Sequence, residues 1–101
     1  MEAVLATDSE SYSDGQAVQL TVTATDSRGP VADAVVRAQV SNAYGERLFG
    51  ESTTRPDGTS ELLHTVETLR DGVGAYEVEV VVSKTGFEPT QRRMTIEVTG
   101  P

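Results

Sequence analysis

The chain has 101 residues, a length that suits one domain with its own core. Its formal net charge of -8 opposes binding to nucleic acid or to an anionic membrane surface, so neither is expected as a partner. Because the sequence contains no cysteine, it can form no disulfide, Cys-based zinc site or thiol nucleophile.

Alternation of apolar and polar residues, the pattern of strands with one buried face, recurs along the chain. The clearest runs are residues 18–25, 36–41, 76–83 and 93–99. Three further strands are predicted from weaker patterns at residues 2–7, 47–53 and 59–66. No segment carries helical i, i+3, i+4 spacing of apolar residues over three turns. We therefore predict an all-β sandwich of about seven antiparallel strands in two sheets.

Turn signals separate these strands at the spacing that a sandwich needs. The sharpest is Gly29-Pro30, because proline has no N–H to offer to a neighbouring strand and pairing should stop there. We interpret this step as the corner at which the chain leaves one sheet for the other. The remaining turns are predicted at residues 13–15, 43–45, 55–58, 71–74 and 85–89.

An odd number of alternating strands places the two ends of the chain at opposite ends of the domain. The loops then fall into two groups, residues 26–33, 54–58 and 84–89 at one end and residues 8–15, 42–46 and 67–74 at the other. The second group is richer in acidic residues, and the chain leaves the domain on that side. We therefore expect residues 1–101 to be one domain of a larger multidomain protein.

The acidic loops hold the candidates for a metal site. Calcium prefers clustered carboxylate and carbonyl oxygens on loops. The candidate ligands are Asp8, Glu10, Asp14 and Asp71. Their spacing matches neither an EF-hand nor a repeat-toxin motif, and acidic loops are common on soluble domains. We therefore predict no metal ion and no other cofactor.

Catalytic signatures are weak in this sequence. His64 is the only histidine, and no nucleophile motif accompanies it. Its side chain faces the core if Leu62 does, and faces water if Leu63 points inward instead. A pair of carboxylates could in principle hydrolyse a glycoside, but the sequence contains no tryptophan to stack against a sugar ring. The sequence therefore predicts no enzymatic role.

Aromatic residues in or near loops are the candidates for contacting a partner: Tyr12, Tyr44 and Phe87. Tyr76 is interpreted as structural instead, because a tyrosine at a sandwich corner often hydrogen-bonds a backbone carbonyl. The sole lysine, Lys84, and the sole asparagine, Asn42, are predicted at opposite ends of the domain. An isopeptide bond between these two side chains is therefore not expected.

Three stretches together resemble bacterial and archaeal immunoglobulin-like domains. Residues 23–36 (TATDSRGPVADAVV) are similar to the strand–corner–strand of invasin/intimin-type repeats, and carboxypeptidase-regulatory and macroglobulin-like β-sandwiches have a similar pattern. Residues 54–60 (TRPDGTS) resemble the T-D-x-x-G-x-A turn of those repeats. Residues 74–80 (GAYEVEV) resemble their G-x-Y-x-V-x-V strand.

The resemblance implies an immunoglobulin-like sandwich that works as a tandem module outside the cell or at its surface. We accordingly expect a non-catalytic spacer or adhesion-type module, monomeric, with neighbouring domains of the same chain as its partners. The alternative is an accessory module of a secreted enzyme that binds an extracellular protein or a glycan. A signal sequence is expected outside these residues. The longest apolar run, residues 80–82, is far short of the ~20 residues of a membrane helix, so direct membrane insertion is not expected.

Overall fold

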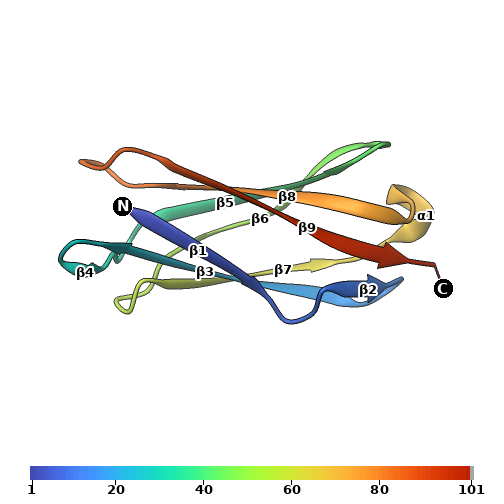
Figure 1. The fold of residues 1–101 in the computed structure, drawn as a ribbon, viewed down its shortest axis with the longest axis horizontal. Coiled ribbons are helices and arrows are strands. Elements are labelled where there is room, and N and C mark those ends of the chain that lie inside the picture. The colour runs from blue at the N-terminus through green and yellow to red at the C-terminus, as the bar shows by residue number, and fades with distance from the viewer. Residues whose placement is uncertain (101) are drawn as a thin grey trace.

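The computed structural model describes residues 1–100, which form two facing β-sheets (Figure 1). In the first sheet, the central strand is β3 (Ala17–Asp26), flanked by β1 (Glu2–Thr7) on one side and by β7 (Thr59–Thr65) and the short β4 (Gly29–Pro30) on the other. The strand order of the second sheet is β2 (Ser11–Ser13), β9 (Thr90–Thr99), β8 (Gly74–Ser83), β5 (Val35–Asn42) and β6 (Gly45–Thr53). Among the described residues the one helix is α1 (Thr68–Asp71).

The core lies between the two sheets and is lined by every second residue of the long strands. The rows from β3 and β8 contribute eight of its twenty buried apolar residues: Val18, Leu20, Val22, Ala24, Tyr76, Val78, Val80 and Val82. Fully burying a valine or leucine side chain contributes about 1.5–3 kcal/mol. The predicted alternation of buried and solvent-facing positions is therefore confirmed, and it accounts for why these segments form strands.

All seven predicted strands are present, but the structure has two additional short strands and one parallel strand pair. The structure adds β2 and β4, which are too short to show any periodicity in sequence. The prediction of purely antiparallel pairing is wrong for β2, which runs parallel to β9. The reason is that residues 8–10 carry the chain from the first sheet, where β1 pairs with β3, to the edge of the second.

The corner predicted at Gly29-Pro30 lies slightly later in the chain, at residues 31–34. Gly29, with a φ of 122°, turns the chain back so that β4 pairs briefly with the end of β3. The crossing to the second sheet follows at residues 31–34, where Thr54 anchors the chain. Its hydroxyl donates to the carbonyl oxygen of Val31 at 2.7 Å and accepts from the N–H of Ala34 at 2.9 Å.

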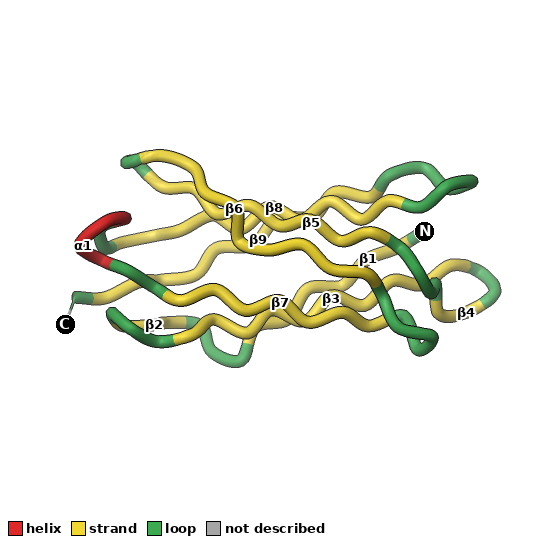
Figure 2. Tube along the Cα trace, turned by 180° about the vertical axis from the view of Figure 1, so that it is seen from behind, coloured by secondary structure: helices red, strands yellow, loops and turns green. Residues whose placement is uncertain are grey.

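The N-terminus and the C-terminal end of β9 lie toward opposite ends of an elongated body measuring 45 × 21 × 16 Å, as predicted (Figure 1). The Thr90 hydroxyl, at the start of β9, donates to the carbonyl oxygen of Met1 at 2.9 Å. From there β9 runs through nine further residues to Thr99, about 30 Å at the usual rise of a strand. Seen from behind, α1 lies at the same end as the C-terminus (Figure 2).

The helix content also bears on membrane insertion. Within residues 1–100 no helix has the length and apolar character needed to cross a membrane.

Candidate functional site

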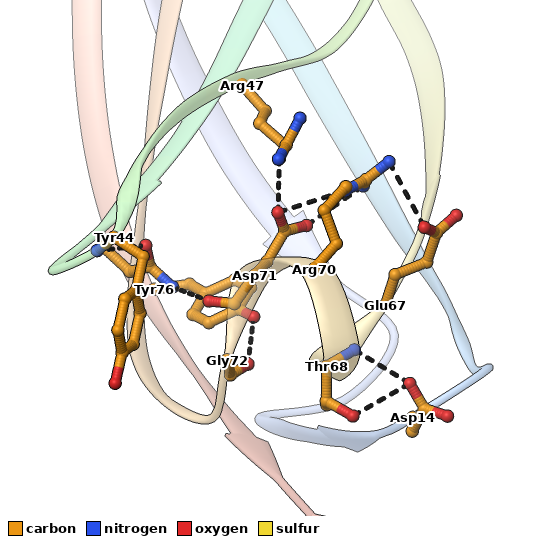
Figure 3. A network of polar contacts seen from close by, with 10 residues as sticks. Asp14, Tyr44, Arg47, Glu67, Thr68, Arg70, Asp71, Gly72 and Tyr76 are labelled. Atoms are coloured by element: carbon orange, nitrogen blue, oxygen red, sulfur yellow. Dashed lines mark hydrogen bonds and ion pairs between the residues drawn. The ribbon is translucent and has the colours of Figure 1, made fainter.

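The most elaborate set of polar contacts lies at the C-terminal end of the domain (Figure 3). It joins the β5–β6 hairpin, residues 42–47, to the α1 loop, residues 67–74, and we call these two segments together the end cap. The side-chain amide of Asn42 donates to the carbonyl oxygen of Asp71 and accepts from the N–H of Tyr44 at 2.9 Å. The hydroxyl of Tyr76 donates to the carbonyl oxygen of Gly72, which confirms the predicted structural role of this tyrosine.

A further contact fixes the start of α1 from the turn between β2 and β3. The Asp14 carboxylate accepts hydrogen bonds from the N–H of Thr68 at 2.8 Å and from its hydroxyl at 3.0 Å. Asp14 lies in the turn between β2 and β3. The α1 loop is therefore held by side chains from three separate parts of the fold.

Asp71 provides the electrostatic centre of the end cap. Its carboxylate is almost fully buried and lies between two guanidinium groups, those of Arg47 and Arg70. Arg70 donates to the two carboxylate oxygens at 3.1 and 3.0 Å, while its remaining amino group lies 3.3 Å from Glu67. These contacts, led by the hydrogen bond from Arg70, hold the pKa of Asp71 below its ordinary value. The two arginines thereby offset the cost of burying a charge.

A small open pocket lies within the end cap, with a volume of about 140 Å³. Its walls include Asn42, Tyr44, Glu46, Arg47 and Asp71. Pockets that enclose drug-sized ligands and cofactors usually measure about 300–1,000 Å³. This pocket is therefore the size of one inserted side chain.

Three apolar side chains of the end cap face solvent. Tyr44 is 78% exposed, Val73 is 54% exposed, and Leu69 is fully exposed. The ring of Tyr44 lies against Gly72, directly before Val73 in the chain. Tyr44 was predicted from the sequence as a candidate partner contact, whereas Leu69 and Val73 were not. The sequence of a loop does not show whether an apolar residue in it is exposed or buried.

The four candidate calcium ligands occupy separate places. Asp8 accepts from the Tyr12 hydroxyl at 2.6 Å and from the N–H of Gln19 at 3.1 Å, and the hydrogen bond from Tyr12 lowers the pKa of its carboxyl. Asp14 holds Thr68, Asp71 pairs with two arginines, and Glu10 is exposed. No group of three or more metal-binding side chains forms within residues 1–100. The structure therefore does not bring these carboxylates together.

The three candidate aromatic contacts have different outcomes. Tyr12 was predicted to be exposed, and this is wrong: pairing of β2 with β9 turns its ring into the core, where 4% of it remains exposed. Tyr44 is exposed, as predicted. Phe87 is half-buried at the N-terminal end, where it lines a groove with Met1 and Arg28. A partner for Tyr44 or Phe87 remains a prediction.

His64 faces the interior, which settles the orientation that the sequence left open. Leu62 beside it is buried, whereas Leu63 is 67% exposed. The imidazole stacks on Phe49 with ring centroids 5.1 Å apart, and its buried Nε2 has no hydrogen-bond partner among the described residues. Burial lowers the pKa of this histidine.

The sole lysine and the sole asparagine are at opposite ends of the domain, as predicted. Lys84 donates to the carbonyl oxygen of Ala32 at 2.6 Å, whereas Asn42 belongs to the end cap.

Comparison by sequence finds no matching family model and no matching curated protein. Comparison by structure finds a superoxide reductase (neelaredoxin) from Ignicoccus hospitalis, with a TM-score of 0.73 and 9% identity over 98% of this chain and 81% of that one. The immunoglobulin-like mouse protein CRIg matches with a TM-score of 0.51 and 16% identity over 100% and 99% of the two chains. The sporulation control protein Spo0M of Bacillus subtilis matches with a TM-score of 0.52 and 16% identity over 96% of this chain. The present chain spans 48% of the length of Spo0M.

These likenesses support a mostly β, two-sheet fold of immunoglobulin-like type. They also correct one prediction. No enzymatic role was predicted from the sequence, but a fold of the same size carries an enzyme, the superoxide reductase. The fold therefore gives no reason to exclude catalysis. At 9% identity the likeness extends to the fold alone.

The composition of this chain does not suit an iron site held by histidine or cysteine. Iron in proteins is held mainly by several histidine imidazoles or cysteine thiolates. This sequence has one histidine and no cysteine.

Proposed function

We propose that the chain is a spacer or adhesion-type module, built as a seven-stranded immunoglobulin-like sandwich with two short added strands, in an exported or cell-surface protein. The observation that carries this proposal is the position of the N-terminus and the C-terminal end of β9 toward opposite ends of a body 45 Å long (Figure 1). A module with this geometry adds about 30 Å to a string of domains, the length of β9 from Thr90 beside Met1 to Thr99. Its neighbours in the same chain are its main partners.

The strand arrangement suits a module under tension. A pull on residue 2 acts along β1 and away from the domain, while a pull on residue 99 acts along β9 in the opposite direction. The ladder between β1 and β3, and that between β9 and its neighbours β8 and β2, are then loaded along the strands. Separation in that direction breaks many hydrogen bonds at once, whereas peeling breaks them one by one.

The outer face of the second sheet suits a monomer. Charged side chains pair across its strands, with Arg37 lying 3.3 Å from Glu51 and Arg93 lying 3.0 Å from Glu79. Each exposed pair contributes little to stability, about 0–1 kcal/mol. Interspersed charges do, however, discourage one sheet face from adhering to another.

Tandem proteins of one, two and three copies, joined end to end, test the spacing role by small-angle X-ray scattering. The proposal predicts that the maximum dimension grows by about 30 Å, the length of β9 from Thr90 beside Met1 to Thr99, with each added copy. Growth of less than half that value would mean that the copies fold back on one another, and the spacer proposal would be rejected.

The alternative role, an accessory binding module of a secreted enzyme, has one observation in its favour. The exposed Tyr44, Leu69 and Val73 of the end cap are apolar. Apolar side chains on a loop favour a protein partner over a glycan, which stacks on aromatic rings and needs convergent polar groups.

A further inference from the structure

We infer that the end cap is a docking surface for a protein partner that presents an apolar side chain flanked by lysine or arginine. This inference deepens the protein-binding alternative and is independent of the spacing role. It depends on three features of the end cap, which are the fixed shape of its loop, its exposed apolar residues and its charge.

The α1 loop is pre-organised. The backbone N–H of Thr68 and the carbonyl oxygens of Asp71 and Gly72 are each bonded to a side chain from outside the loop. A loop that is already ordered loses little conformational entropy on binding, so more of the contact energy is available as affinity.

The apolar residues stand on this fixed loop. Leu69 is fully exposed on α1, although α1 itself is tied down at both ends. Isolated exposed apolar residues are common on proteins, but here the ring of Tyr44 lies against Gly72, three residues further along the chain and directly before the exposed Val73. Aromatic and aliphatic anchors of this kind, next to a pocket for one side chain, are typical of the centre of a protein interface.

The charge of the end cap favours a basic partner. Arg47 and Arg70 both direct their guanidinium groups at the buried Asp71, so their charge is partly neutralised within the cap. Glu46 is exposed and lines the pocket together with Tyr44, whereas the exposed Glu67 is paired with Arg70 at 3.3 Å. An ammonium group placed between Tyr44 and Glu46 would meet both an aromatic face and a carboxylate. The net charge of -8 on the whole chain attracts such a partner from a distance.

Two synthetic peptides test the inference, one with a leucine flanked by lysines and one in which glutamates replace those lysines. Binding to the intact chain is measured by fluorescence anisotropy and mapped by amide chemical shifts. We expect the lysine peptide to bind, to perturb residues 42–47 and 67–74, and to bind more weakly as salt rises to about 0.15 M. The glutamate peptide should not bind.

Matched variants show whether the apolar residues carry the binding. Leu69→Ser should weaken binding of the lysine peptide about tenfold without changing the melting temperature, because this side chain is fully exposed. Tyr44→Ser should weaken binding to a similar extent, and its melting temperature is measured separately because the ring also lies against Gly72. Leu63→Ser is the control, since Leu63 is a similarly exposed leucine on the outer face of β7 and should leave the affinity unchanged.

The inference is overturned if the lysine peptide does not bind, if the glutamate peptide binds equally well, if the shifts map outside the end cap, or if Leu63→Ser weakens binding as much as Leu69→Ser. None of these outcomes affects the spacing role, because the dimensions of tandem copies are measured without a peptide.

Discussion

The ring of Tyr44 lies directly against Gly72, and a Cβ atom added at Gly72 would come within 2.7 Å of its Cε2 atom. Gly72 also has a φ of +81°, which a residue with a side chain rarely adopts. This contact places the β5–β6 hairpin on the α1 loop, and it explains why a glycine is needed at this position.

Three glycine-to-alanine variants separate backbone strain from contact. All three positions have a positive φ, so each variant should lose about 1–3 kcal/mol of unfolding free energy from strain. Gly86→Ala adds no contact, Gly72→Ala displaces the exposed Tyr44 ring, and Gly58→Ala drives a Cβ to 2.5 Å from the backbone oxygen of Ala24. Urea unfolding should therefore rank the losses Gly58 above Gly72, and Gly72 at or above Gly86. The reverse order would contradict these packing contacts.

Removing the Tyr76 hydroxyl should loosen the α1 loop. Tyr76→Phe leaves the carbonyl oxygen of Gly72 without its partner and should cost about 1 kcal/mol of unfolding free energy. Tyr44→Phe is the control, because within residues 1–100 the Tyr44 hydroxyl makes no hydrogen bond, so stability should not change. Amide exchange at residues 67–74 should accelerate in Tyr76→Phe alone, and equal behaviour of the two variants would contradict this role.

Thr54 should be one of the most sensitive polar residues in the chain. Thr54→Val removes both hydrogen bonds to the crossing segment, leaving the N–H of Ala34 and the carbonyl oxygen of Val31 unpaired. Each unsatisfied buried group costs about 1–3 kcal/mol, so thermal unfolding should shift to clearly lower temperature. Thr53→Val, at the neighbouring exposed position on β6, should unfold like the unaltered chain.

His64 should make stability depend on pH just below neutrality. Because burial lowers its pKa in the folded chain, the folded state resists protonation, whereas the unfolded state binds a proton near the usual value of 6.5. Unfolding free energy should thus be highest above pH 6.5 and should fall as the pH drops from there through the lowered pKa. His64→Phe keeps an aromatic ring on Phe49 without a titrating group. Over the same pH range its stability should be flat, and an unchanged slope would exclude His64 as the cause.

The strands could be predicted from the sequence because their information is local. In residues 18–25 and 76–83 the two-residue period alone determines which side chains are buried, and the structure agrees. The same local reading located Tyr76 correctly at a corner. β2 was missed because three residues show no period, and Tyr12 was consequently placed in solvent.

The end cap could be predicted only in part, because its contacts join residues far apart in the chain. In the sequence, Asp71 cannot be distinguished from the other acidic loop residues. Its role becomes visible only in the fold, where Arg47 and Asn42 of the β5–β6 hairpin contact it. The grouping of loops at the two ends did follow from the sequence, because it depends only on the alternation of strand direction.

Single-molecule pulling in two directions tests most directly the claim that this domain is built to span and bear load between its two ends. In one experiment force is applied through the two ends of the chain, which loads β1 and β9 along their length. In the other it is applied between the C-terminal end and a Val73→Cys attachment, the sole cysteine of that variant. Because Gly74 pairs with Val98, this second direction peels β9 from β8. The account predicts a clearly higher unfolding force in the first direction, and equal or lower force there would contradict it.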